Sequence, residues 1–348
     1  MKRLLTDFST EFRDRVLGIL WRQWTTVGVF GDGQSWRNSV IDPESLLLLS
    51  CSVARHDARL FDAMMEWLSL NNRSLNIQRL KRILKEESFS GDRVLQALAA
   101  SVTTSVNAAK WQGIGSVPDE GYVEERPLFF LGDGRPLPVP QEKDPIFLVH
   151  GFLRSPFQAR GVAAAFRPEP VANLLLRLRA FMGISARCEV LLYLLCKREG
   201  SPRAMARECY YYPATMSKAL NEMEQSGYLL SRIEGRRRCY RLVPDLWADL
   251  FLGDHPQPPW IVWPRLFGAL DRLWLFMDGA ALGQESPLAL ASSLRRILRD
   301  SVISQLDRSN LAFVFGDDSA YPDESLLPYF VERTGALLSA IEELHVGG

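Results

Sequence analysis

The sequence predicts a mainly α-helical protein in which a central unit of three helices and a β-hairpin lies between two helical domains. Apolar residues recur at helical spacing in residues 1–109 and 255–348. Residues 110–169 are rich in proline, and two strand-like runs follow residue 227. A chain of 348 residues with 47% hydrophobic and 24% charged residues is long enough for two or three globular domains.

Residues 1–109 are predicted to form a helical domain. Apolar side chains share one helical face over residues 12–20. Asp42-Pro43 is typical of a helix start, because aspartate accepts bonds from first-turn amides and proline needs no amide there. Two further helical segments flank the polar turn at 71–74. That pair is a possible degenerate second helix-turn-helix, although an ordinary helical hairpin is the favoured interpretation.

Residues 110–169 are predicted to be a proline-rich extended connector. Nine prolines between Trp111 and Pro170 exclude long helices. The apolar run Ile146–Val149 and the nearby phenylalanines still require burial. We therefore expect the connector to pack against a neighbouring domain rather than to be disordered.

Residues 255–348 are predicted to form a C-terminal helical domain, in which Ser286-Pro287 begins one helix. The apolar stretch 260–283 contains four charged residues, which would be costly in lipid, so we expect an amphipathic helix in water. The first sixteen residues carry acidic side chains where a signal peptide needs an apolar run. These patterns favour a cytoplasmic protein that makes no membrane contact.

Residues 170–247 form the central unit, whose elements are bounded by local start and stop signals. In order, they are a helix over 171–181 ending at Gly183, a helix from Ser185 to Gly200, a short helix from Ser201-Pro202 to Cys209, a helix from Pro213 closed by Gly227, and the strands Tyr228–Ile233 and Arg237–Leu242, joined at Glu234-Gly235-Arg236. This is the order of a three-helix unit followed by a charged hairpin.

The helix that begins at Pro213 has one apolar face and one polar face. Met216, Leu220 and Met223 fall at i, i+4 and i+7 and should face the core of the unit. Charge is also uneven along the chain. Residues 171–243 hold thirteen basic and six acidic residues, a net charge of +7, while the rest of the chain carries −7. Such asymmetry favours contact between this segment and phosphate.

Three strings in this segment match a known pattern when taken together. Pro213–Leu220, Asn221–Leu229 and Ser231–Leu242 resemble the recognition helix, the helix exit and the wing of the ArsR/MarR-type bacterial regulators. The resemblance covers about a fifth of the chain and departs from the family at Tyr210–Tyr212, where smaller residues are usual. It implies a winged helix-turn-helix that binds double-stranded DNA, most simply as a repressor-like transcriptional regulator.

The resemblance assigns the DNA-binding residues and the assembly. The recognition helix would present its N-terminal residues to base edges, and the hairpin tip would meet phosphates or the minor groove. The three tyrosines of the turn can offer hydroxyls to phosphates. A homodimer is expected, with the 170–182 helix or the C-terminal helices as its interface. The residues expected to contact DNA are Tyr212, Pro213, Ala214, Thr215, Ser217, Lys218, Asn221, Arg232, Arg236, Arg237 and Arg238.

Two alternative functions remain open. The acidic flanking domains could hold a protein partner, so that the winged helix serves as an interaction scaffold or an antitoxin-like module. The flanking domains could also sense a small effector in a DNA-binding regulator. A hairpin that stays exposed favours DNA, and a hairpin buried against residues 1–109 favours the scaffold.

No constellation typical of an enzyme, cofactor site or metal site is present in the sequence. Ile146–Phe152 resembles the strand and His-Gly loop of α/β-hydrolases, but the chain has no G-x-S-x-G nucleophile motif. Five cysteines in a chain without an export signal favour reduced thiols, and the four histidines lack metal-ligand spacing. We therefore expect neither catalysis nor a bound metal.

Overall fold

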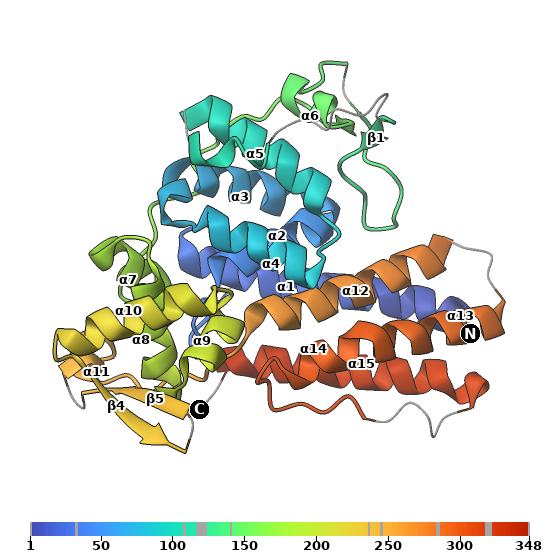
Figure 1. The fold of residues 1–348 in the computed structure, drawn as a ribbon. Helices are drawn as coiled ribbons and strands as arrows, with labels where there is room; N and C mark the ends of the chain where they lie inside the picture. Colours follow the sequence, from blue (N-terminus) through green and yellow to red (C-terminus); the bar gives the residue numbers. More distant parts are fainter. Residues whose placement is uncertain are drawn as a thin grey trace.

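The computed structural model describes residues 2–31, 34–106, 109–115, 124–139, 141–235, 237–243, 246–282, 286–316 and 322–346. The protein is mainly helical, as the sequence predicts, and its strands are few and short. No helix in these ranges is long and apolar enough to span a bilayer. Figure 1 shows three groups of elements around a long first helix.

The first helix and the four that follow it form the first group. In Figure 1 the four later helices lie in the upper part of the view, and the first helix runs beneath them toward the C-terminal helices. They are α1 (Lys2–Val27), α2 (Pro43–Val53), α3 (Ala58–Asn71), α4 (Ile77–Glu87) and α5 (Asp92–Val106). The predicted start of α2 is confirmed, because the Asp42 side chain accepts the Ser45 amide at 3.1 Å. A short 3-10 turn, Asn72–Ser74, separates α3 from α4.

The C-terminal helices pack directly on this first group. They are α12 (Trp263–Leu282), α13 (Pro287–Ile297), a π-helical turn (Leu298–Val302), α14 (Ile303–Asp307) and α15 (Asp323–Val346). Helix α1 lies along α12 and α15, and α2 packs on α12. The rings of Phe8 and Phe330 pack together with their centroids 6.3 Å apart, and those of Trp36 and Trp263 pack with their centroids 5.7 Å apart. The two flanking segments, expected as separate domains, therefore share one hydrophobic core.

The proline-rich segment lies over this shared core. Its regular elements are short: the 3-10 turn Ala109–Trp111, α6 (Pro145–Val149), and a parallel pair of strands, β1 (Arg126–Pro127) and β2 (Phe152–Leu153). The side chains of Phe129, Phe147 and Phe152 are buried in the shared core. Burial of these rings explains how a segment with so many prolines stays packed on the body.

Residues 174–243, called here the helix–hairpin unit, have a second core of their own. The elements are α7 (Leu174–Met182), α8 (Ala186–Lys197), β3 (Glu199–Gly200), α9 (Pro202–Cys209), α10 (Pro213–Gln225), β4 (Leu229–Glu234) and β5 (Arg237–Leu242), and α11 (Leu246–Phe251) follows. The three strands form an antiparallel sheet in the order β3-β5-β4. Met205, Met216 and Leu220 are fully buried beneath it.

Two details of this unit differ from the sequence-based expectations. Helix α8 ends at Lys197 rather than at Gly200, because Arg198 has a φ of 65° and the next two residues pair with β5. Helix α7 buries its leucines inside the chain, which leaves Phe181 as its large exposed apolar residue. The 170–182 helix therefore offers little apolar surface for a dimer interface.

Candidate nucleic-acid interface

Helix α10 presents the polar face that the sequence predicts. Met216 and Leu220 are fully buried and Met223 is 8% exposed, so the apolar face is confirmed. Thr215 and Lys218 are exposed on the opposite side, and Ser217 is half-buried. The ammonium group of Lys218 lies 4.0 Å from Glu222, one turn further along the helix. A pair this exposed contributes little to stability and leaves the lysine available to a ligand.

The N-terminus of α10 is open to solvent. Tyr212 is the N-cap residue and contributes no side-chain acceptor to the first turn. Pro213 occupies the first helical position, and Ala214 and Thr215 beside it are exposed. The amides of a first turn have no acceptor inside the helix, so they favour an anion at this end.

Asn221 is oriented by the hairpin, a contact that the sequence pattern does not predict. The Tyr240 hydroxyl on β5 donates a hydrogen bond to Asn221 Oδ1 at 3.0 Å. The Tyr240 ring is buried, while Asn221 is exposed. Because the amide oxygen accepts this bond, the amide nitrogen stays available to donate to a base edge or a phosphate.

The hairpin arginines divide into paired and unpaired side chains. Arg238 Nη2 lies 2.8 Å from both carboxylate oxygens of Glu224 on α10. Arg232 Nη2 lies 2.9 Å from Glu199 and from Glu234. Arg237 is exposed and has no ion pair with any described residue. Arg236 lies outside the described residues.

These pairings reduce the free positive charge of the hairpin. Among the described positions, Arg237 and Arg241 keep uncompensated guanidinium groups, whereas Arg232 and Arg238 are partly neutralised by carboxylates of the chain. The reason is the register of the hairpin, which pairs Arg238 with Ile233 and turns its side chain back over α10. A contact between Arg238 and phosphate would have to compete with Glu224.

The turn before α10 contacts the helical body instead of solvent. The expectation that three tyrosine hydroxyls are offered to phosphates is wrong for two of them. Tyr210 donates to Glu87, and burial together with that carboxylate raises the pKa of Tyr210, which keeps the donor protonated. Tyr211 donates to Glu189 at 3.0 Å. Tyr212 remains 70% exposed.

A buried network of charges lies behind this turn. Arg79 on α4 contacts Asp42 and Glu44 at the start of α2, and its Nε donates to the Cys209 carbonyl at 2.9 Å. Arg179 on α7 lies 2.6 Å from Glu44 and 2.8 Å from Glu189 on α8. The side chains of all five are at most 10% exposed. Sequence reasoning missed this network because its members are far apart in the chain.

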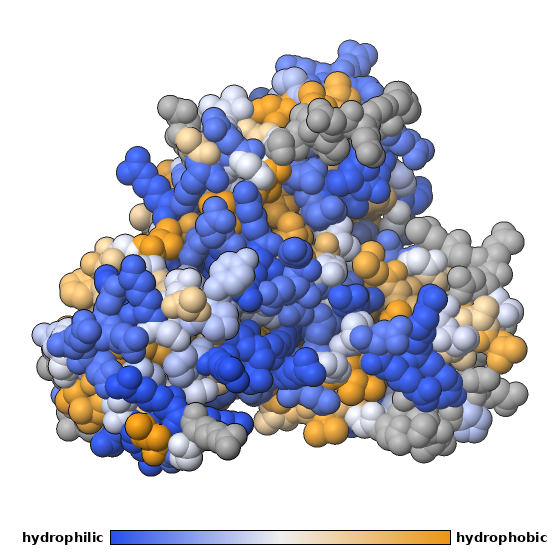
Figure 2. Space-filling model, viewed as in Figure 1, coloured by the Kyte–Doolittle hydropathy of each residue, from blue (hydrophilic) through white to orange (hydrophobic). Residues whose placement is uncertain are grey.

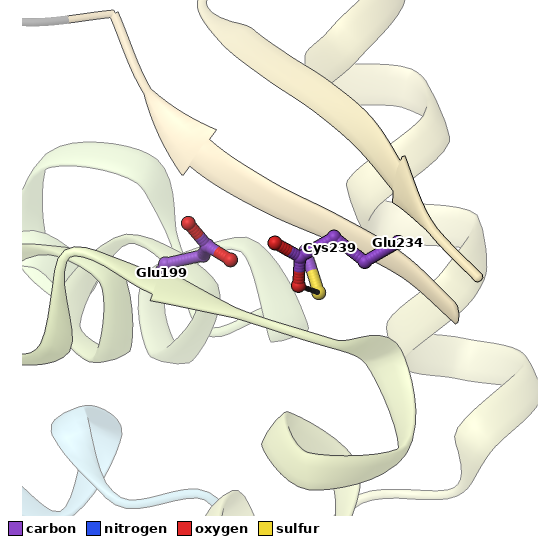
Figure 3. A group of neighbouring side chains, drawn as sticks. All are labelled: Glu199, Glu234 and Cys239. Carbon is purple, nitrogen blue, oxygen red and sulfur yellow. Dashed lines mark hydrogen bonds between the residues drawn. The ribbon is translucent and has the colours of Figure 1, made fainter. Parts of the chain in front are cut away.

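One group of metal-type ligands does form at the edge of the hairpin, although the sequence has no metal-site spacing. Figure 3 shows Glu199, Glu234 and Cys239 pointing toward one another from β3, β4 and β5, with ligand atoms within 4.8 Å. Arg232 already pairs with both carboxylates. Burial and the two carboxylates also raise the pKa of the Cys239 thiol, which disfavours the thiolate that metals prefer. This group fits an ion-pair cluster better than a metal centre.

Comparison of the chain with protein-family models, with curated proteins and with solved structures gives no match. The resemblance to ArsR/MarR-type regulators therefore stays a prediction that depends on the residues of the helix–hairpin unit alone.

Proposed function

We propose that the helix–hairpin unit is a winged helix and that the protein binds double-stranded DNA with sequence preference, as a transcriptional regulator. The observation that carries this proposal is the outward face of α10. The helix buries its methionines and leucine and leaves Thr215, Lys218 and Asn221 exposed beside an exposed hairpin.

The dimensions of α10 suit the major groove. Its 13 residues give a rod about 20 Å long at 1.5 Å per residue. The major groove of B-DNA admits a helix of this kind, and its base edges carry a pattern of donors and acceptors that amide and ammonium groups can distinguish. Arg237 at the tip would then reach the phosphates beside the groove.

The position of the hairpin favours DNA over a scaffold role. A hairpin buried against residues 1–109 would favour a protein-interaction scaffold. Instead Ile233 on β4 is 79% exposed, and Arg237 and Arg238 on β5 are exposed too. The body contacts the unit through Arg179 on α7 and through Tyr210 and Tyr211 of the turn before α10.

The proposal includes a homodimer, because one such helix makes few base contacts and specific regulators commonly read two half-sites about 10 base pairs apart. Light scattering of the protein alone should give twice the chain mass of 39.4 kDa, and on duplex DNA it should give that protein mass in addition to the mass of the duplex. A mass of one chain in both measurements would contradict the dimer and leave the DNA-binding proposal to the selection experiment below.

Selection from a pool of random duplexes tests the proposal itself. The wild-type protein should enrich one motif over successive rounds, and two copies of the motif in inverted order are expected if the dimer forms. Leu220→Ala is unsuitable as a negative control because Leu220 is fully buried and its loss would destabilise the unit. Lys218→Ala keeps the fold and should enrich the motif more weakly. Selection that enriches no motif would contradict sequence-specific binding.

A further inference from the structure

The outward face of α4 is basic. Gln78, Lys81, Arg82 and Lys85 fall at i, i+3, i+4 and i+7, and all are exposed or half-buried. This helix belongs to a flanking domain of the chain, and the flanking segments together carry a negative charge. The sequence pattern therefore did not predict a basic surface here. The opposite face of the helix, with Leu80 and Ile83, is buried in the shared core.

The structure fixes this basic helix beside the start of α10. Asn76 Nδ2, at the start of α4, donates to the Tyr211 hydroxyl at 2.7 Å. Arg82 lies over the Tyr212 ring, with its Cζ 4.4 Å from the centroid, a cation–π contact. These contacts join α4 to the residues that immediately precede Pro213. Helix α4 and the N-terminus of α10 therefore lie side by side on one surface.

A groove of about 470 Å³ runs between the two helices. It is lined by the outward residues of α4 and by Tyr212 and Thr215 at the start of α10. Figure 2 shows hydrophilic side chains gathered where α4 approaches α9 and α10. Lys81 and Lys85 form no ion pair with any described residue.

The charge balance of this groove is positive. Arg82 Nε donates to Glu86 Oε1 at 2.5 Å, and Glu86 is the one acidic residue in the lining. That pair is neutral overall and leaves the ammonium groups of Lys81 and Lys85 uncompensated. Two ammonium groups one helical turn apart, next to solvent, are suited to bind phosphate as point charges.

We propose that this groove binds backbone phosphates of the same DNA duplex that α10 reads, and so extends the interface beyond the helix–hairpin unit. The inference rests on the proposed function, because the groove opens beside the exposed N-terminus of α10 that would enter the major groove. DNA is favoured over an acidic peptide because the basic groove and the outward face of α10 form one continuous surface. The helical body then positions a second phosphate contact in addition to supporting the fold.

The salt dependence of DNA binding tests this inference. The full-length chain is compared with Lys81→Gln/Lys85→Gln, which keeps most of each side-chain stem and removes two charges. The matched control is Arg59→Gln/Lys143→Gln, which removes two exposed charges from α3 and from the segment before α6. Affinity for a labelled duplex is measured by fluorescence anisotropy over a series of KCl concentrations, and melting curves show that each variant is folded.

The double variant on α4 should reduce the slope of log K against log salt by about 1.8, because each lost phosphate contact removes about 0.9. Lys85→Gln alone, at an exposed position, should reduce this slope by about 0.9. The Arg59→Gln/Lys143→Gln control should keep the wild-type slope. If the wild-type protein binds DNA and both α4 variants keep its slope, the groove does not bind phosphate, and the proposed function is unaffected. If the wild-type protein binds no duplex, both the proposed function and the proposal that the groove binds phosphate are overturned.

Discussion

Asn221 and Tyr240 show how a single hydrogen bond can prepare a base-reading side chain. The Tyr240 hydroxyl donates to the amide oxygen of Asn221, which leaves the amide nitrogen available to donate to DNA. The sequence does not predict this hydrogen bond, because the two residues lie 19 positions apart on different elements. If α10 reads bases, the orientation of this amide contributes to specificity and adds little to the electrostatic part of affinity.

Asn221→Ala should therefore weaken binding to a selected duplex by about 1–3 kcal/mol, the usual value of a base contact. Tyr240→Phe keeps the buried ring and removes only the hydroxyl, so it should produce a smaller loss of about 1 kcal/mol on the same duplex. Binding to a scrambled duplex should hardly change in either variant. Competition binding measures these differences. Wild-type specificity in Tyr240→Phe would show that the hydrogen bond does not orient Asn221 for DNA.

The hairpin arginines give a second prediction at the scale of single residues. Arg237→Ala should reduce the salt slope of DNA binding by about 0.9, because its guanidinium has no carboxylate partner among the described residues. Arg238→Ala is the matched neighbour and should change the slope less, since Glu224 holds its guanidinium. Salt titrations of DNA binding by both variants measure these slopes. Equal slope reductions would mean that Arg238 leaves Glu224 when DNA binds.

At the scale of elements, the buried network decides how the helix–hairpin unit is attached to the body. Arg179 on α7 pairs with Glu44 on α2 and with Glu189 on α8, and its guanidinium also donates to the Ser74 carbonyl at 2.9 Å. Burial raises the pKa of the Asp42 carboxyl in the same network, but the charge and hydrogen bonds of Arg79, together with the Ser45 amide and the charge of Arg179, lower the pKa overall. The Asp42 carboxyl therefore stays ionised in the folded state.

Removal of one partner should consequently be costly. Arg179→Met leaves the buried Glu189 carboxylate without its cation and leaves Glu44 with Arg79 alone, and it should lower the free energy of unfolding by about 3–5 kcal/mol. Arg177→Met, on the same helix but half-buried, removes hydrogen bonds to backbone carbonyls and should cost about 1 kcal/mol. Chemical denaturation compares the two. Similar small losses of unfolding free energy in the two variants would show that water or rearranged side chains replace the bonds from Arg179 to the carboxylates.

The local elements of the helix–hairpin unit could be predicted from the sequence, and the contacts that hold it in place could not. Ser201-Pro202 and Pro213 begin α9 and α10 as predicted, and Gly227, with a φ of 81°, closes α10. These signals act within a few residues. The partners of Tyr210 and Arg179 are up to 135 positions away and depend on how α4 and α2 pack against the unit. The paired state of Arg238 likewise depends on the hairpin register.

At the scale of the whole molecule, α1 and α12 join the two ends of the chain into one core. His56 lies at this junction, with its ring 5.2 Å from Phe130 and 5.0 Å from Trp274. Burial, with smaller effects of Arg13 and Arg55, lowers the pKa of His56 to about 4. The neutral ring is therefore part of the folded state, whereas the unfolded chain protonates it near its ordinary pKa of about 6.5.

This difference predicts how stability depends on pH. The contribution of His56 is fully present above about pH 6.5 and is lost as pH falls toward 4, because the unfolded chain then binds the extra proton. The loss should approach about 3 kcal/mol at 1.36 kcal/mol per pKa unit. His56→Gln should flatten the profile between these two pH values, and the exposed His255→Gln should keep it. Urea denaturation across the range measures both, and identical profiles for wild type and His56→Gln would contradict the role of the buried ring.

One competition measurement tests most directly whether α10 reads a DNA sequence. Wild-type protein on a labelled selected duplex is displaced by the same duplex or by a scrambled one of equal length and composition, at a fixed salt concentration near 0.15 M. Specific protein–DNA complexes are typically at least about 10³-fold tighter than nonspecific ones, and we predict a ratio of this order. Equal displacement by the two duplexes would contradict the sequence-specific function.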